Sequence, residues 1–266
     1  MIPMAQTAFA IGAHPDDIEF VMAGTLLLLK QAGFETHYMT LANGNCGGRE
    51  QDGTATARTR RHEARNAAAR AGAIFHDSLV KDLEILYEVK TLRRLAAVVR
   101  EVAPAILLTH YPCEYMEDHT NTCRLALSAA FVRGMPNFVV SPPRPTTDQA
   151  VTVYHSLPFG LRDPLRRRIR AGLYVNIGDV LTAKRDMLAM HKSQKEWLDV
   201  SQGMDSYLKA MTDMAREVGG MSARFEYAEG WTRHLAAGFC DAAADPLLAA
   251  LPGLAVVDER FERELG

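Results

Sequence analysis

A histidine and two carboxylates follow a short apolar segment near the start of the chain. Thr7–Gly12 is apolar and strand-like, and His-Pro-Asp-Asp follows it at positions 14–17. A helix-like segment begins directly afterwards, at Ile18. Open α/β sheets carry their chemistry at the carboxyl ends of the strands, where a strand passes into a helix. These side chains therefore stand where a metal or a proton would be handled.

A helix cap is the alternative interpretation of the same motif. Asp16 or Asp17 can serve only as the N-cap, with Pro15 shaping the turn. One aspartate is enough for a cap, so we favour a chemical role. Residues three apart at the start of a helix can converge on one point, which makes His14 and Asp17 candidate ligands of a mononuclear zinc site. Asp16 between them is left to take a proton from water activated by the metal.

The third ligand is expected at another strand-to-helix junction. His119 fits best, since it follows the predicted strand Ala105–Thr109. It reaches the same sheet edge if that strand is a parallel neighbour of the first. His110 is a weaker alternative ligand. The competing interpretation makes His119 a surface histidine at a helix N-terminus that Asp118 or Thr120 caps.

The elements that position these residues alternate along the first half of the chain. Alternating or buried apolar runs predict strands over Thr7–Gly12, Glu35–Leu41, Ala73–Ser78, Ala105–Thr109 and Val151–His155. Helices are predicted over Ile18–Ala32, Thr56–Ala71, Thr91–Val102 and Asp118–Arg133. The pattern predicts an α/β, Rossmann-like, doubly wound and mostly parallel sheet with helices on both faces.

The second half is less regular, and we expect one domain over residues 1–266. Its core spans about 6–155, and an irregular C-terminal portion spans about 156–266. Within that portion the sequence predicts a helix over Asn176–Lys192, a helix-permissive stretch over Ser193–Val218 and a strand over Phe225–Trp231.

Composition excludes several functional classes. The 266 residues are 48% hydrophobic and 23% charged, with a net charge of −2, which gives no basis for nucleic-acid binding. The longest apolar run, Phe20–Leu29, is too short to span a membrane. Cysteines at 46, 113, 123 and 240 have no C-x-x-C spacing, so we expect free thiols and a cytoplasmic protein.

At this point the motifs resemble a known family. Ala-His-Pro-Asp-Asp after an N-terminal strand resembles the opening motif of the LmbE-like, or PIG-L, zinc-dependent N-deacetylases. Further similar landmarks occur in the family's order, from Ala8 to about Phe239. They are Thr40–Gly44, Arg60-x-x-Glu63, Lys81–Glu84, the segment from His110 to His119, His191–Gln194 and Tyr227–Gly230.

The resemblance implies a role for each matching residue. It assigns His14, Asp17 and His119 as ligands of one Zn²⁺ and Asp16 as the general base. It further implies that Arg60 and Asp82 contact a substrate sugar, although Arg60 can instead pair with Glu63 in its own helix. The implied substrate is a small N-acylated molecule that contains a sugar, and the implied assembly is a homo-oligomer.

One position departs from the family. The second motif commonly contains His-Pro-Asp-His, whose first histidine protonates the leaving amine or stabilises the oxyanion, and here Met116 occupies that place. A thioether cannot donate a proton. His155 is our preferred replacement acid, with His110 and His191 behind it, although a buried, hydrogen-bonded His155 is the competing interpretation. Asp16 can also act first as base and then as acid.

These observations predict a zinc-dependent hydrolase that removes an acetyl group from an N-acetylated amino sugar or its conjugate. Two alternatives stay open. One is a metal-dependent amidase that acts on a small amide without a sugar. The other is a ligand-binding relative with little or no catalysis, which the methionine at 116 favours and the complete ligand set with Asp16 opposes.

Overall fold

The protein contains one mixed β-sheet in the parts of the chain that the computed structural model describes, residues 6–48, 51–194 and 206–265. The sheet order is β3-β2-β1-β4-β5-β7-β6-β8. The strands are β1 (Thr7–Gly12), β2 (Glu35–Thr40), β3 (Ile74–His76), β4 (Ile106–Thr109), β5 (Thr152–Ser156), β6 (Leu173–Asn176), β7 (Ala228–Arg233) and β8 (Ala255–Val257).

The N-terminal part of the sheet is parallel and doubly wound. β1 pairs with β2 on one side and with β4 on the other, and β3 and β5 extend the sheet outward, all in parallel. The chain therefore reverses its direction of sheet growth between β1 and β4, with Ala8 beside Ile106 and Ile11 beside Thr109. This confirms the predicted fold class, and the parallel pairing of β1 with β4 meets the condition under which His119 reaches the sheet edge of His14. The crevice at such a reversal is where open sheets bind ligands.

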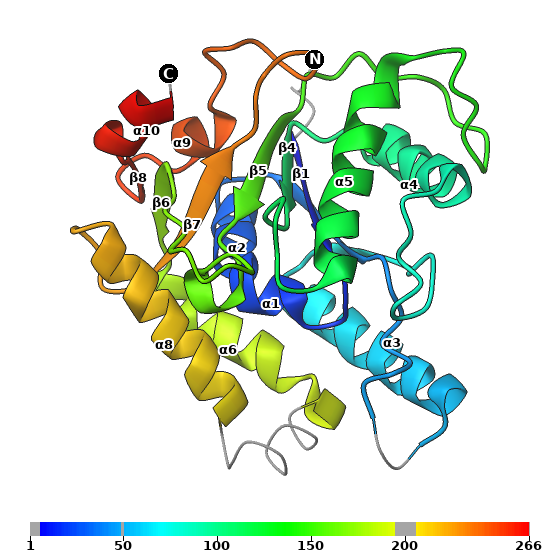
Figure 1. Cartoon of the computed structure of the whole chain (residues 1–266), viewed down its shortest axis with the longest axis horizontal. Helices are drawn as coiled ribbons and strands as arrows, with labels where there is room; N and C mark the ends of the chain where they lie inside the picture. Colours follow the sequence, from blue (N-terminus) through cyan, green and yellow to red (C-terminus); the bar gives the residue numbers. More distant parts are fainter. Residues whose placement is uncertain (1–5, 49–50, 195–205, 266) are drawn as a thin grey trace.

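Helices cover both faces of the sheet (Figure 1). Side chains of β1 alternate between two cores, since Ala8 and Ala10 belong to one and Phe9 and Ile11 to the other. The first core includes α1, α2, α3 and α6, and the second includes α4 and α5. The helices are α1 (Asp17–Val21), α2 (Ala23–Gln31), α3 (Gly53–Arg70), α4 (Val89–Val102), α5 (Glu117–Phe131), α6 (Leu181–Ala189), α8 (Ser206–Met221), α9 (Pro246–Ala250) and α10 (Glu259–Leu265).

The C-terminal portion extends the same sheet with antiparallel strands. β7 pairs with β5 and β6, and β8 completes that edge beside β6. Figure 1 shows β6, β7 and β8 beside the short helices α9 and α10. The strands β6 and β8 were not predicted. The predicted helix Asn176–Lys192 is shorter, because its first residue ends β6 and α6 begins only at Leu181. Of the stretch Ser193–Val218, residues 195–205 lie outside the described residues, and α8 covers its end.

The predicted helix Ile18–Ala32 is two helices, because a distant side chain caps the second one. The backbone leaves helical geometry at Met22, and α2 begins at Ala23. The Glu229 carboxylate of β7 accepts the N–H groups of Gly24 (2.8 Å) and Thr25 (2.7 Å). Buried Lys184 of α6 donates to the same carboxylate at 2.6 Å. A carboxylate at a helix N-terminus satisfies free N–H groups and the helix dipole together, and Glu229 is far from these residues in the sequence.

None of the helices in the described residues is long and apolar enough to cross a membrane. All four cysteines are free, as expected.

We predict that Glu229→Gln destabilises the protein by about 3–5 kcal/mol, because it leaves the Lys184 ammonium buried without its counter-charge. Urea unfolding monitored by circular dichroism measures the change. The control is Glu217→Gln, which removes the exposed Arg168–Glu217 ion pair and should cost at most about 1 kcal/mol. Equal losses in the two variants would contradict this role for Glu229.

Candidate metal centre and cavity

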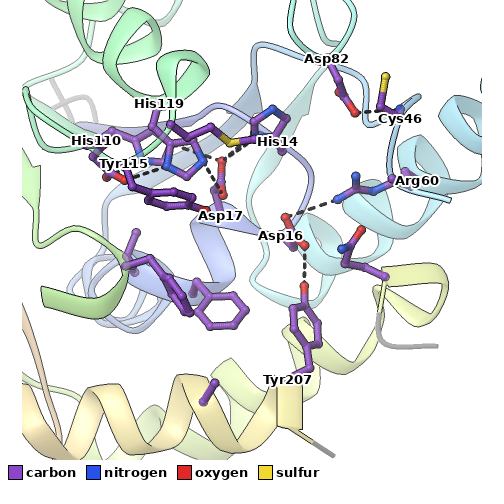
Figure 2. A pocket seen from close by; sticks show the side chains of 18 of the residues that line it. His14, Asp16, Asp17, Cys46, Arg60, Asp82, His110, Tyr115, His119 and Tyr207 are labelled. Atoms are coloured by element: carbon purple, nitrogen blue, oxygen red, sulfur yellow. Dashed lines mark hydrogen bonds and ion pairs between the residues drawn. The ribbon is translucent and has the colours of Figure 1, made fainter. Parts of the chain in front are cut away.

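A cavity of about 460 Å³ opens where β1 and β4 end. Its volume lies in the usual range of small-molecule sites. Of the site residues expected from the sequence, His155 and His191 do not line it, whereas the others do: His14, Asp16, Asp17, Arg60, Asp82, His110 and His119. Figure 2 shows the histidines grouped around Asp17, with Asp16 turned toward Arg60 and Tyr207.

Asp17 is the centre of the predicted ligand set. His14, Asp17 and His119 each offer a ligand atom within 4.8 Å of the others. Asp17 Oδ1 lies 3.4 Å from His119 Nε2, and Oδ2 lies 3.5 Å from His14 Nδ1. Oδ2 also accepts the backbone N–H groups of Ala13 (3.1 Å) and His14 (2.7 Å). These bonds turn the carboxylate back to the end of β1, so Asp17 does not cap α1.

A carboxylate stands behind each of the two histidines. Asp118 Oδ2 lies 2.9 Å from His14 Nε2, and Glu114 Oε2 lies 2.8 Å from His119 Nδ1. Each histidine therefore keeps one nitrogen for the cavity, Nδ1 in His14 and Nε2 in His119. Histidines that bind metals usually donate their other N–H to such a carboxylate, which fixes the tautomer and the ring. The residues thus fit a bound metal.

In this cluster the histidines and the carboxylates shift each other's pKa values toward the charged forms. Burial alone would lower the pKa of His14, but the hydrogen bonds to Asp118 and Asp17 raise it to about 10. Burial would raise the pKa of Asp17, yet the neighbouring histidines hold it well below its usual range. Burial likewise opposes ionisation of Glu114, whereas His110 and His119 lower its pKa to about 2. These carboxylates are ionised at neutral pH, as metal binding requires.

His110 lies beside the ligand set with both nitrogens engaged. Its ring stacks on His119 with the centroids 4.2 Å apart. The Ala13 N–H donates to its Nε2 (2.9 Å), and its Nδ1 lies 3.2 Å from Glu114 Oε1. His110, Glu114 and His119 also form a second, fully buried group with metal-ligand spacing. Since His119 already turns its Nε2 to Asp17, we do not interpret this group as a second metal site. Glu114 instead holds the rings of His110 and His119 in place by hydrogen bonds.

Asp16 has the backbone and the partners of a functional residue. Its φ of 113° is left-handed, which is strained for a residue other than glycine. Its side chain makes no cap hydrogen bond with α1. Instead Oδ2 accepts the Tyr207 hydroxyl at 2.6 Å, and Oδ1 lies 3.4 Å from Arg60 Nη2. Burial raises the pKa of Asp16, and the positive charge of Arg60 partly counters this rise.

Arg60 and Asp82 organise the loop that follows β2. Asp82 Oδ1 accepts the Gly44 N–H (2.6 Å), and its Oδ2 accepts the Cys46 N–H (2.9 Å). Arg60 donates to the carbonyls of Pro15 and Gly44. A Cβ at Gly44 would lie only 2.6 Å from the Arg60 side chain, so the glycine makes room for the arginine. The alternative pairing of Arg60 with Glu63 is not observed, because Glu63 accepts from Ser193.

The candidates for the missing acid lie in different places. Met116 lines the cavity, whereas His155 does not. His155 Nδ1 lies 2.9 Å from the His110 carbonyl, and its Nε2 lies 3.0 Å from His234 Nδ1. His191 is buried with Nε2 3.3 Å from Glu19 Oε1. The structure does not bring His155 to the metal ligands, and its catalytic role stays a prediction from the sequence.

Sequence reasoning missed Glu114, Asp118 and Tyr207. The first two had a local signal, since Glu114 is four residues after His110 and Asp118 directly precedes His119. Tyr207 had none, because it reaches Asp16 from 191 residues away.

Part of the chain matches the model of a known protein family. Residues 9–130 match the family model of PIG-L, GlcNAc-PI de-N-acetylase. A diacetylchitobiose deacetylase of Thermococcus kodakarensis is 28% identical over 230 residues, which cover 83% of this chain and 80% of that protein.

Two solved structures share the fold. The N,N'-diacetylchitobiose deacetylase of Pyrococcus horikoshii, in complex with an inhibitor, has a TM-score of 0.71 at 20% identity and covers 92% of this chain and 89% of its own. The 4-carboxy-2-hydroxymuconate hydratase GalB of Pseudomonas putida also has a TM-score of 0.71, at 23% identity, over 86% of this chain and 95% of its own.

We predict that Glu114→Gln and Asp118→Asn each weaken Zn²⁺ binding by about 10–100-fold, because each removes the carboxylate that orients a metal-binding histidine. Competition with a chromogenic chelator measures the affinity. Glu117→Gln is the matched control, since Glu117 lies in the same helical turn with its side chain exposed. Unchanged affinity in both test variants would contradict the assignment.

We predict that stability falls as the pH is lowered from about 6.5 to about 4. Burial lowers the pKa of His155 to about 4, so in this window the unfolded chain takes up a proton that the folded chain excludes. His155 then costs on the order of 2–3 kcal/mol at the acid end. Urea unfolding at several pH values should show a shallower pH dependence for His155→Gln. Parallel curves for the two proteins would show that His155 does not carry the effect.

Proposed function

We propose that the chain is a metal-dependent N-deacetylase of the PIG-L family, whose model its residues 9–130 match. Its proposed substrate is an N-acetylated amino sugar or a conjugate of one, in line with the diacetylchitobiose deacetylase that is similar over most of its length. The products are acetate and the free amine. We keep the expected homo-oligomer and cytoplasmic location as predictions.

One observation carries the proposal: three ligand groups and a separate carboxylate line the same cavity. His14, Asp17 and His119 would hold the metal, and Asp16 is left outside the ligand set. Two histidines and one carboxylate are a common catalytic zinc set, so we propose Zn²⁺. When bound, such an ion polarises the amide carbonyl and lowers the pKa of water.

Asp16 is the proposed base, and its two oxygens have different tasks. Tyr207 donates to Oδ2 at 2.6 Å and holds the carboxylate in place. Among the described residues, Oδ1 makes the longer contact with Arg60 at 3.4 Å, so we assign it as the oxygen that accepts the proton of the attacking water. A neighbouring aspartate can do this when its orientation is fixed.

Asp16 is also the proposed donor to the leaving amine. The thioether of Met116 carries no proton, and the nitrogens of His110 are occupied by the Ala13 N–H and Glu114. Protonated Oδ1 then donates this proton to the nitrogen of the tetrahedral intermediate as the C–N bond breaks, which releases the amine and returns Asp16 to its carboxylate form. One carboxylate serves as base and then as acid.

We predict that Asp16→Asn lowers acetate release by at least about 10³-fold while the bound metal is retained, because Asp16 is not a ligand. The assay follows acetate from N-acetylglucosamine, diacetylchitobiose, sugar conjugates and simple N-acetyl amides. Metal content is measured by atomic emission. Asp77→Asn, an exposed aspartate outside the cavity, is the control.

Full activity of Asp16→Asn would overturn the mechanism. Acetate released only from amides without a sugar would favour the amidase. No metal retained after reconstitution and no acetate released would favour a binding protein. Acetate is the proper readout because the solved hydratase has the same fold, and a fold does not determine a reaction.

A further inference from the structure

Four aromatic side chains form a continuous surface along one side of the cavity. This aromatic arc consists of Tyr115, Phe159, Phe20 and Tyr207, all of which line the cavity. Successive ring centroids lie 6.3, 5.6 and 5.2 Å apart, with tilted or edge-on geometry. The rings come from the loop after β4, the segment after β5, α1 and α8, so the tertiary structure assembles the arc.

The arc connects the two halves of the reaction centre. At one end the ring of Tyr115 contacts the ring of His119, with centroids 5.4 Å apart. At the other end the Tyr207 hydroxyl bonds Asp16. Figure 2 shows Tyr115 beside the histidine cluster and Tyr207 pointing at Asp16. A ligand held at His119 and Asp16 therefore lies against this arc.

The outer part of the arc is exposed although it is apolar. Tyr115 is 60% exposed and Phe159 is 48% exposed. Leu83, which also lines the cavity, is 66% exposed and has a left-handed φ of 63°, held by the bond from its N–H to Asp118. Apolar side chains gathered at a cavity, with one on a strained backbone, indicate a surface that a ligand covers.

Two charged side chains that line the cavity, Asp82 and Arg60, make hydrogen bonds or ion pairs within the protein. Both oxygens of Asp82 accept backbone N–H groups, and Arg60 is directed at Asp16 and at backbone carbonyls. A second sugar ring would require partners for its hydroxyl groups. A flat apolar ring requires none and can stack on the exposed faces of Tyr115 and Phe159.

We infer that the substrate carries an aromatic aglycone that stacks on the aromatic arc while its acetamido group lies at the metal ligands. This inference rests on the proposed function and narrows its substrate class. The aglycone contributes binding energy away from the reacting amide, so it sets specificity.

The test compares 4-nitrophenyl and methyl 2-acetamido-2-deoxyglucosides as substrates of the Zn²⁺-loaded protein. We expect kcat/KM for acetate release to be about tenfold higher for the aromatic glycoside. Phe159→Ala and Tyr115→Ala should each reduce this ratio to about one to three. Phe131→Ala is the matched control: its ring is 44% exposed but lies against Phe239 outside the cavity, and it should keep the ratio.

A ratio near one in the unmodified protein would overturn the inference while leaving the proposed function intact. A tenfold ratio of kcat/KM that is unchanged in both Phe159→Ala and Tyr115→Ala would also overturn the inference. An octyl glycoside preferred over the aromatic one would also overturn it, since it would assign the arc to an apolar chain.

A binding measurement separates this inference from the reaction. Isothermal titration calorimetry with Asp16→Asn measures Kd for both glycosides without turnover. We expect about tenfold tighter binding of the aromatic glycoside, and loss of that difference in Asp16→Asn combined with Phe159→Ala. If the binding preference is observed but the unmodified protein releases no acetate, the proposed reaction is wrong and the aromatic binding site is supported. Equal affinities, or no binding of either glycoside, would overturn the aromatic site.

Discussion

The Asp17 carboxylate is the interaction on which the site depends. It accepts two backbone N–H groups at the end of β1, and the rings of His14, His110 and His119 face it. A buried carboxylate is costly unless it is paired and hydrogen-bonded. Its burial therefore requires that β1 and β4 be neighbours and that the segment after β4 fold back over them. The parallel pairing of these strands meets that requirement.

Further carboxylates surround Asp17 and its histidines, and their hydrogen bonds connect the site to other segments of the fold. Asp118 binds His14 and also the Leu83 N–H, so the loop after β3 is held by the same carboxylate that orients a ligand. Glu114 joins His119 to His110. Farther away, Glu229 and Lys184 fix the break between α1 and α2. Each carboxylate here holds two or more segments, which makes the geometry rigid before any ligand arrives.

Met116 stands where the related motif has a histidine, and this affects both proton transfer and the shape of the cavity. Without a histidine at that position, Met116 adds an apolar side chain to the cavity wall, which Tyr115 and Leu83 also line. In the proposed mechanism, Asp16 carries out the proton transfer; its side chain contacts Tyr207 and Arg60, and its backbone is strained. The same replacement that removes an acid also makes the cavity more suitable for an apolar group. In our proposals, the use of Asp16 as both base and acid follows from this one position, whereas the aromatic aglycone follows from the aromatic arc.

The sequence alone predicted the strands of the parallel half, the doubly wound fold class and the residues expected to hold the metal, because these depend on local patterns. Alternating apolar runs mark β1 and β4, His14 and Asp17 follow β1, and His119 lies in the helix that follows β4. Features made by side chains far apart in the chain were decided only by the tertiary structure. Glu229 divides a helix 205 residues away, Tyr207 reaches Asp16 across 191 residues, and His155 is turned away toward His234. The periodicity of apolar residues shows which side of a segment is buried. Long-range contacts depend instead on which other segment packs against that side, and this is decided by the tertiary structure.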